Sequence, residues 1–474
     1  MLFCLCGVSQ AIDCRLRGYD GDKIETLNCE STAITQSPLR VTDPSGTVWG
    51  VSLVDPGIPG ATKIRICYLD ASGNPVIKAL AYTFSGALDT CEDMQMIGLH
   101  PSFPTDRKYY LTHDIDCSAT NPSPTNPKYP GSLWQLGYYE FFKHRGYDNR
   151  EGTDDDDLAS FRGEGFALEG FAPLGCGWSG ESKFFTGTFD GRGFKVTNLF
   201  INRGGNRGDV GLIGRTNGAI VKNLGIVGAT ISDNLCVGGL VGNAIGHTII
   251  TNCYVSGDLQ SDKGAVGGLV GQSADTSIKD CYFIGNVTSV SDKVGGLVGT
   301  GSVTVDNSFA MGTVSGSASV GGLLGSGTTT ITNSFAANNV SSSSDGGGGL
   351  VGGGSNITMI NSFSTGAVTS AFAGGVIGNY SAGVLANNWW FSANASGVGN
   401  SNPAGVTKAG ALAEFFGIGS ADGGGAVYRN SAAAGASNAW DFVKVWEPGV
   451  GILPHLRVKC PPGGSWNSDT EVCE

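Results

Sequence analysis

A short glycine-rich motif that recurs seven times in the middle of the chain constrains the fold most strongly. It reads VGLIG at 210–214, VGGLVG at 237–242, 266–271 and 294–299, VGGLLG at 320–325, GGLVG at 348–352 and GGVIG at 374–378. The equivalent glycines are Gly211, Gly239, Gly268, Gly296, Gly322, Gly349 and Gly375. Each unit holds two or three short β-prone runs, which cannot bury a core alone. Like units must therefore stack and share one core.

A second motif follows each copy of the first. It reads VKNLG at 221–225, ITNCY at 250–254 and IKDCY at 278–282. Four further variants follow, and the last of them is LANNW at 385–389. In a stack its third position becomes one column, in which side-chain amides can form a ladder at a bend. That column is Asn223, Asn252, Asp280, Asn307, Asn333, Asn361 and Asn387.

An aromatic column lies two residues after the asparagine column in six of the seven units. It consists of Tyr254, Tyr282, Phe309, Phe335, Phe363 and Trp389. Stacked rings at one repeat position form either a packing row or a platform for sugars. The pattern leaves both interpretations open.

The composition favours stacked strands over stacked helices. The chain has 474 residues, of which 77 are glycine, and only 15% are charged. Glycine and β-branched residues stand where helical repeats need alanine, leucine and charge. We therefore predict an all-β protein whose main part is a parallel β-helix, or β-solenoid, with turns of about 27 residues and strands about 4.8 Å apart.

These motifs resemble the GLUG repeat family over roughly residues 109–458. FTGTFDGRGFKVTNLFI at 185–201 is similar to the turn that leads into such repeats, and YYLTHDIDCS at 109–118 to their first capping strand. AWDFVKVW at 439–446 and LPHL at 453–456 are similar to their closing segment. The resemblance implies a right-handed β-helix on bacterial surfaces. Many members are adhesin-like, and some repeats are attached to IgA-specific metallopeptidases.

The flanking segments complete the expected domain organisation. Residues 1–11 resemble the end of a secretory signal, the alternative being a plain N-terminal strand. We expect a small β-rich, sandwich-like domain at 12–105, and a cap with the first turn at 106–204 that carries a long insertion at 118–175. The repeats occupy 205–400, the closing segment 401–458 and a cysteine-containing tail 459–474.

Charge and cysteine usage narrow the location and the partners. The net charge of −12 disfavours nucleic acid and anionic membranes, and no apolar run is long enough to span a bilayer. Thirteen cysteines without a CxxC pair indicate disulfides in an oxidising compartment. We therefore expect an exported protein, extracellular or on the cell surface.

Sequence-near pairing gives the disulfide candidates. The expected pairs are Cys14–Cys29, Cys67–Cys91, Cys117–Cys176 and Cys460–Cys473. Cys253 and Cys281 share one column on adjacent turns, close enough for a bridge. The alternative for these two is a pair of stacked free thiols.

The motifs of common enzymes are absent from the sequence. It has no HExxH, GxSxG or Walker motif, and its five histidines are scattered. A polysaccharide lyase or hydrolase is the enzymatic alternative, but such sites need clustered carboxylates and the repeat columns are nearly uncharged. Asp280 is expected to be a polar substitute for asparagine. A calcium hypothesis rests on Asp154, Asp155, Asp156 and Asp157; no other cofactor is expected.

The long insertion carries the predicted ligand contacts. The turns between repeats are too short to anchor a ligand, whereas the insertion holds an aromatic cluster: Tyr138, Tyr139, Phe141 and Phe142. The alternative is a small core under the loop. We thus predict a non-catalytic, adhesin-like protein that binds a glycan or a surface protein. The other alternative is a structural envelope or filament component that associates through the solenoid ends.

Overall fold

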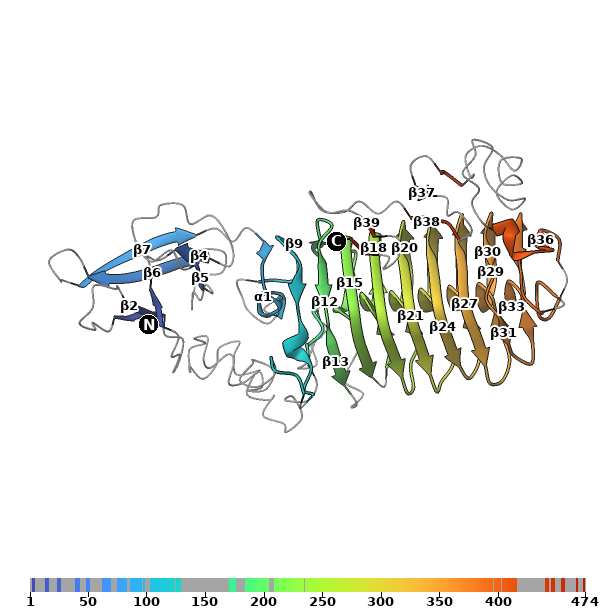
Figure 1. Ribbon diagram of the computed structural model, residues 1–474, viewed down its shortest axis with the longest axis horizontal. Helices are drawn as coiled ribbons and strands as arrows, with labels where there is room; N and C mark the ends of the chain where they lie inside the picture. The colour runs from blue at the N-terminus through green and yellow to red at the C-terminus, as the bar shows by residue number, and fades with distance from the viewer. Residues whose placement is uncertain are drawn as a thin grey trace.

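The computed structural model describes residues 86–128, 170–175, 184–203, 209–415, 440–447 and 453–456, with short gaps in these ranges. It gives several further strands by their backbone alone. Its main part is a parallel β-solenoid of about seven turns, each of roughly 28 residues, between residues 188 and 390 (Figure 1). The predicted fold class is therefore confirmed.

Most strands belong to the solenoid. Its first strands are β8 (Ala87–Leu88), β9 (Lys108–Leu111), β10 (Ile115–Asp116), β11 (Thr188–Asp190), β12 (Lys195–Thr197) and β13 (Phe200–Arg203). The strands of the first repeats are β14 (Ile213–Asn217), β15 (Ile220–Asp233), β16 (Val237–Gly238), β17 (Val241–Ile245), β18 (Thr248–Ser261), β19 (Val266–Gly267), β20 (Val270–Lys279) and β21 (Tyr282–Ser289). Next come β22 (Val294–Gly295), β23 (Val298–Asp306), β24 (Phe309–Gly316), β25 (Val320–Gly321), β26 (Leu324–Thr332), β27 (Phe335–Ser342), β28 (Gly347–Gly348) and β29 (Val351–Ile360). The last turns hold β30 (Phe363–Ser364), β31 (Val368–Thr369), β32 (Ala373–Gly374), β33 (Ile377–Tyr380), β34 (Gly383–Ala386), β35 (Asn388–Trp390) and β36 (Val406–Lys408).

One turn consists of a two-residue strand and two longer ones. In the turn formed by β22, β23 and β24, each strand pairs in parallel with its counterpart one repeat later, β25, β26 and β27. The short strands form a six-stranded sheet of their own, in the order β16-β19-β22-β25-β28-β32. The glycine motif therefore supplies one narrow wall of the solenoid, and the longer strands supply the others.

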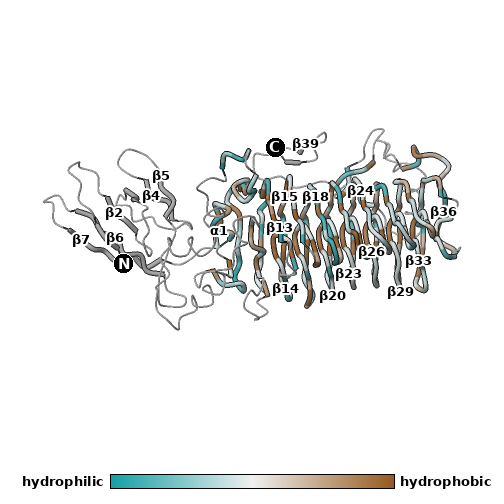
Figure 2. The backbone as a smooth tube through the Cα atoms, turned by 90° about the horizontal axis from the view of Figure 1, so that it is seen from below, coloured by the Kyte–Doolittle hydropathy of each residue, from teal (hydrophilic) through white to brown (hydrophobic). Residues whose placement is uncertain are grey.

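Apolar columns fill the interior of the solenoid. The leucines of the glycine motif stack directly and are fully buried: Leu240, Leu269, Leu297, Leu323 and Leu350. Figure 2 shows apolar and polar segments in close succession along the strands, as the alternating burial of each strand requires. One continuous core results, and no single repeat could form it.

The glycine pair present in six of the seven motifs allows very close packing inside that core. A Cβ atom on Gly268 would lie 2.1 Å from the carbonyl oxygen of Gly296 and 2.2 Å from Cγ of the Phe283 ring. Real side chains never come so close, so any larger residue would force the turns apart. This steric limit explains why the motif keeps glycine in consecutive repeats.

The asparagine column marks a sharp bend between two long strands. All seven residues of the column adopt left-handed backbone angles, with φ between 47° and 54°. Asparagine and aspartate tolerate this region better than other non-glycine residues. The side-chain amide nitrogen of Asn252 donates to the amide oxygen of Asn223 at 2.9 Å, and that of Asn387 donates to Asn361 at 2.8 Å. Hydrogen bonds between turns thus fix the bend.

A second ladder runs just inside the bend. The backbone N–H of Ser308 donates to the hydroxyl of Ser334, and the N–H of Ser334 donates to Ser362. Cys253 and Cys281 occupy the same column in earlier turns, where the N–H of Cys253 donates to Sγ of Cys281 at 3.3 Å. Both thiols are free and buried. The cysteines therefore replace serine in this ladder and form no bridge with each other.

The N-terminal end of the solenoid is closed by α1 (Cys91–Gln95) and η1 (Ser118–Thr120). Leu88, Cys91 and Met94 belong to the same hydrophobic cluster as Tyr109 and the repeat core. The solenoid therefore begins near residue 86 and not at the predicted boundary after residue 105. The reason is that the apolar residues of β8 and α1 cover the otherwise open end of the core.

A disulfide joins Cys91 to Cys117 across this cap, with a Cα–Cα distance of 5.3 Å. The predicted pairs Cys67–Cys91 and Cys117–Cys176 are therefore wrong. Proximity in sequence misled the prediction, because the parallel stacking of β8 on β9 brings the two cap segments together. The predicted pairs Cys14–Cys29 and Cys460–Cys473 each include a cysteine whose side chain lies outside the described residues.

The N-terminal strands pair in an antiparallel manner, unlike the repeats. They are β1 (Leu2–Cys4), β2 (Asp13–Leu16), β3 (Ile24–Thr26), β4 (Leu39–Thr42), β5 (Val48–Val51), β6 (Thr62–Leu69) and β7 (Pro75–Tyr82). β1, β2 and β3 form one sheet, while β4–β5 and β6–β7 form two-stranded pairs. Strand β1 lies within the segment that resembles a signal.

The C-terminal elements are short. They are η3 (Leu412–Phe415), β37 (Trp446–Glu447), β38 (His455–Leu456), β39 (Trp466–Asn467) and β40 (Val472–Cys473). Residues 440–447 and 453–456, here called the C-terminal strap, pack along the side of the solenoid (Figure 1). Within the described part of the predicted closing segment, only β36 extends the stack itself, by pairing with β35.

Candidate ligand-binding face

The aromatic column lies outside the solenoid core and forms a second hydrophobic cluster. Neighbouring rings stack with centroids 4.8 to 5.0 Å apart and nearly parallel planes, from Tyr254 to Phe363. The strap covers the column: the Trp446 ring lies 5.8 Å from the Phe335 ring, and the Trp440 ring lies 5.5 Å from the Phe363 ring. Phe335 and Phe363 are 0% exposed. The column is a packing row, and in this state it offers no platform to a sugar.

A polar face lies beyond the aromatic column, past a glycine bend at Gly257, Gly285 and Gly312. These glycines have φ between 114° and 150°, and a Cβ atom on any of them would lie within about 2.1 Å of a carbonyl oxygen one turn away. After the bend the outward side chains are amides and hydroxyls, apart from the carboxylate of Asp258. The bend therefore separates the covered aromatic row from a row that is open to solvent.

Two columns make up this polar face. The first consists of Thr230, Asp258, Asn286, Thr313 and Asn339, all exposed. The second consists of Asn202, Ser232, Gln260, Thr288, Ser315, Ser341 and Thr369, each exposed or half-buried. Asp258 is the only charged side chain in either column. The face thus presents regularly spaced neutral donors and acceptors.

Hydrogen bonds between turns orient the side chains of the polar face. The amide nitrogen of Asn286 donates to Oδ1 of Asp258 at 2.7 Å, and the hydroxyl of Thr313 donates to Oδ1 of Asn286 at 2.6 Å. In the second column, the hydroxyl of Ser232 donates to Oδ1 of Asn202 at 3.1 Å. Side chains held in this way lose less freedom when they bind a ligand, which favours affinity.

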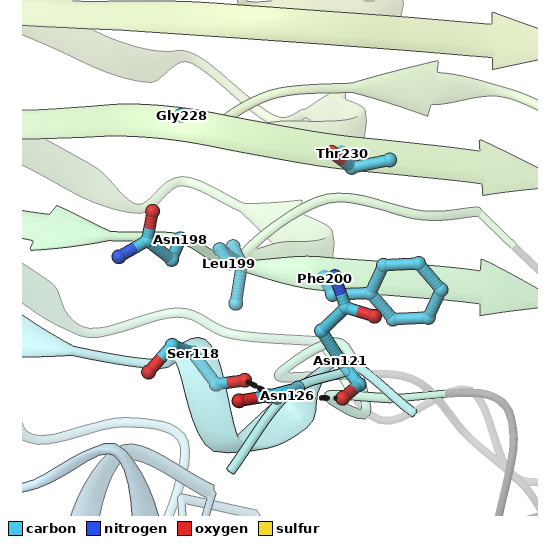
Figure 3. Close-up of a pocket in the computed structure, with 8 residues that line it drawn as sticks. All are labelled: Ser118, Asn121, Asn126, Asn198, Leu199, Phe200, Gly228 and Thr230. Carbon is cyan, nitrogen blue, oxygen red and sulfur yellow. Dashed lines mark hydrogen bonds between the residues drawn. The ribbon is translucent and has the colours of Figure 1, made fainter. Parts of the chain in front are cut away.

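A pocket of about 240 Å³ lies at the N-terminal end of the polar face (Figure 3). Its walls come from three parts of the chain. The lining residues are Ser118, Asn121 and Asn126 of the cap, Asn198, Leu199 and Phe200 around the start of β13, and Gly228 and Thr230 of β15. None of the eight is ionisable. Thr230 also begins the first column, so the pocket and the polar face are continuous.

The cap side of the pocket is held by a set of short hydrogen bonds. The side-chain nitrogen of Asn126 donates to the carbonyl oxygens of Ser118 and Asn121, each at 2.7 Å (Figure 3). The backbone N–H of Phe200 donates to the hydroxyl oxygen of Thr120 at 3.0 Å. These bonds fix the loop against β13, so the pocket is preformed.

Asp116 connects two walls of the pocket, because its carboxylate bonds both Ser118 and Asn198. Its carboxylate accepts hydrogen bonds from the backbone N–H of Ser118 at 3.0 Å and from the amide nitrogen of Asn198 at 3.1 Å, and it pairs with Lys128. Burial alone would raise the pKa of this carboxyl, but the bonds from Lys128, Asn198 and Ser118 outweigh it and hold the pKa well below its usual range. Asp116 is therefore ionised and committed to structure.

Other carboxylates of the described repeats also occupy structural positions. Oδ1 of Asp190 accepts from the N–H of Arg192 at 2.9 Å, which makes Asp190 a turn former, and from the side chain of Asn223 at 3.0 Å. Asp280 stands in the asparagine column, where burial raises the pKa of its carboxyl above the ordinary value. Among the described residues, no group of three or more His, Cys, Asp or Glu side chains could hold a metal ion.

The predicted contact residues Tyr138, Tyr139, Phe141 and Phe142 lie outside the described residues, as do Asp154, Asp155, Asp156 and Asp157. The polar face and the pocket were not predicted from the sequence. Full alignment of the repeats would have revealed the first column, since Thr230, Asp258 and Asn286 occupy equivalent positions. The pocket joins segments about 80 residues apart in sequence, and no local sequence pattern predicts that contact.

Comparison with known proteins agrees with this architecture. The model of the GLUG motif matches residues 233–260 and 263–288, each of which spans about one turn of the solenoid. Two successive turns of this chain therefore carry the GLUG motif. Halomucin of Haloquadratum walsbyi (strain DSM 16790 / HBSQ001) is 30% identical over 168 residues, which cover 35% of this chain. The chain matches only 1% of the length of halomucin. Among the described residues, no helix is both long and apolar enough to cross a membrane.

Proposed function

We propose that this GLUG-repeat chain is an exported, adhesin-like protein that binds a neutral glycan along its polar face without chemically changing it. The observation that carries the proposal is the pair of solvent-facing columns of amides and hydroxyls. Sugars offer rows of hydroxyl groups that both donate and accept hydrogen bonds, and such columns match them. The nearly uncharged character of the face favours a neutral partner over a charged one.

The location is part of the same proposal. The GLUG repeats and the similarity to halomucin support an extracellular or cell-surface protein. The disulfide between Cys91 and Cys117 supports an oxidising compartment. These features agree with a protein that meets glycans outside the cell.

Binding without catalysis is supported by the use of the carboxylates. Cleavage of a polysaccharide needs a pair of carboxylates or a carboxylate with a base at one point of the groove. Asp116 and Asp190 are instead engaged by several hydrogen bonds each, and Asp258 is bonded by Asn286. Incubation of the protein with the glycan that it binds should release no shorter products.

A screen of glycans and of host surface proteins tests the proposal. Thr313→Lys places a long charged side chain in the middle of the polar face, and Thr304→Lys makes the same change at an exposed threonine on β23, away from the face. We expect at least one neutral glycan to bind, with affinity reduced about tenfold or more in T313K and unchanged in T304K. No bound glycan, or an equal loss in both variants, would contradict the proposal.

A second candidate function is structural, through association of solenoid ends. Phe372 and Val384, both near the C-terminal end of the stack, are 52% and 58% exposed. Exposed apolar side chains beside a sheet end favour end-to-end contact. Light scattering over a range of concentrations tests this: growth in size that the double variant Phe372→Asp, Val384→Asp abolishes would support it, and a constant monomer would exclude it.

A further inference from the structure

The two ends of the polar face differ, because the pocket and its cap loop close the N-terminal end. Ser118, Asn121 and Asn126 stand on the cap side of the segment 198–200, while Gly228 and Thr230 lie on the opposite side (Figure 3). On the Thr230 side the column continues with Asp258 and Asn286. A chain that lies on the face can therefore extend toward the later repeats, but it meets the cap loop at the pocket.

We propose that the pocket holds the terminal residue of a neutral glycan, with the following residues on the polar face. This inference rests on the proposed function and adds that the protein recognises a chain end. The cap loop supplies the stop, and it is fixed by Thr120, which accepts from Phe200, and by Asn126, which bonds Ser118 and Asn121. A rigid stop selects ends, because an internal segment would have to pass through it.

The lining matches the two kinds of surface that a sugar ring carries. Phe200 offers a half-buried aromatic ring for the C–H groups of a sugar. Among the described residues, the amide nitrogen of Asn121, the amide oxygen of Asn198 and the hydroxyl of Thr230 have no protein partner. These three groups can both donate to and accept from sugar hydroxyls.

The charge and size of the pocket exclude other ligands. None of its eight lining residues is ionisable, so phosphate, sulfate and uronate groups would find no counter-charge. A volume of about 240 Å³ suits one small ring and not an oligosaccharide. Gly228 helps to keep the space open, because it has a φ of 68° and a Cβ atom there would lie 3.2 Å from Oδ1 of Asn198.

The test uses the full chain and a panel of methyl glycosides of neutral hexoses, observed by saturation-transfer difference NMR. Thr230→Lys fills the pocket mouth with a charged side chain. The matched control is Thr304→Lys, an exposed threonine on β23, away from both the pocket and the polar face. We expect at least one methyl hexoside to bind the wild type and T304K, and its affinity to fall at least tenfold in T230K.

The outcomes separate the inference from the proposed function. If no methyl hexoside binds the wild type, or if T230K binds as well as T304K, the terminal-residue site is wrong. Should a polysaccharide still bind in that case and be lost in T313K, the proposed function stands without it. A circular dichroism spectrum unchanged from the wild type shows that each variant is folded.

Discussion

The indole Nε1 of Trp440 donates a hydrogen bond to the backbone carbonyl oxygen of Asn361 at 2.9 Å, although 79 residues separate the two in sequence. Asn361 belongs to the ladder that fixes the bend of its turn. The contact therefore joins the C-terminal strap to a structural column of the repeats. It also places the Trp440 ring over the aromatic row.

Replacement of Trp446 by Ala should detach the strap. The Trp446 side chain is 0% exposed and packs on Phe309, Phe335 and Trp440. Loss of a buried tryptophan typically costs about 3–5 kcal/mol. We expect the melting temperature to fall and the uncovered aromatic row to bind a hydrophobic dye before the solenoid itself unfolds.

Phe372→Ala is the matched control for this prediction. Phe372 is 52% exposed, so its loss should change the free energy of unfolding by less than about 0.5 kcal/mol. Dye binding equal to that of the wild type in W446A would show that the strap stays in place without Trp446.

Asp280→Asn should stabilise the protein. Oδ1 of Asp280 is buried without a hydrogen-bond partner among the described residues, and the position has the left-handed backbone that asparagine favours. Removing a buried unsatisfied acceptor of this kind is worth about 1–3 kcal/mol. Urea unfolding at pH 7 measures the increase in the free energy of unfolding, and Asp258→Asn on the exposed face serves as the control. A variant no more stable than the wild type would contradict the expectation.

The gain from Asp280→Asn should depend on pH in a defined direction. Burial, together with the charge of Asp306, raises the folded-state pKa of Asp280, against the opposing effects of Asn307 and Lys279. The folded protein then holds the proton more tightly than the unfolded chain does. That stabilisation is complete below the ordinary pKa of 3.8 and is lost as the pH rises through the folded pKa. The advantage of D280N should therefore be largest at neutral pH and shrink toward pH 3.8.

The cysteines should react according to their surroundings. Burial and the nearby Asp209 charge raise the pKa of Cys236 to about 12, and burial beside Cys253 raises the pKa of Cys281. Since the thiolate is the reactive form, iodoacetamide at pH 8 should label these thiols slowly in the folded protein and rapidly in denaturant. Peptide mapping without reduction should recover Cys91 joined to Cys117. Cys253 joined to any distant cysteine would contradict the register of the repeats.

The Cys91–Cys117 bond should stabilise the cap. It closes a segment with a sequence separation of 26 residues, and cross-links of this length are worth about 3 kcal/mol. The double variant Cys91→Ser, Cys117→Ser should unfold at a lower urea concentration. Because Cys117 precedes the pocket loop, this variant should also bind methyl hexosides more weakly. The single variant Cys236→Ser is the control and should behave as the wild type.

The aromatic cluster at Tyr138, Tyr139, Phe141 and Phe142 remains a prediction of ligand contact. Once a glycan is known, the double variant Tyr138→Ala, Tyr139→Ala should weaken its binding by about tenfold or more while the melting temperature stays unchanged. A lowered melting temperature would instead favour a packing role. Unchanged affinity would leave the polar face as the binding surface.

The solenoid could be predicted from the sequence because each turn imposes the same steric and backbone requirements. Residues of the same type therefore recur at the same spacing. Gly268 stands where any side chain would clash with its neighbours, and Asn252 stands at a left-handed bend that favours asparagine and aspartate. The same residue types therefore recur at these positions in successive repeats. The aromatic column was visible too. The strap that covers the column was not predicted, because Trp440 and Trp446 lie outside the repeats and follow no periodic pattern.

The candidate site escaped prediction for a related reason. Thr230, Asp258 and Asn286 share polarity and position but not identity, so a search for repeated letters passes over them. The pocket depends on Asn121 meeting Asn198 and Phe200, and the disulfide depends on Cys91 meeting Cys117. Both contacts follow from how the cap folds onto the first turn, which is a three-dimensional relationship between segments without a shared motif.

The strap also has a mechanical consequence. In an unsupported stack, a pulling force can strip turns one at a time, because each turn contacts only its neighbours. Here Trp440 and Trp446 together touch rings from three successive turns, those of Phe309, Phe335 and Phe363. No one of these turns can leave without breaking contacts to the strap. The strap therefore acts as a splint, and tension on the chain is shared across these turns.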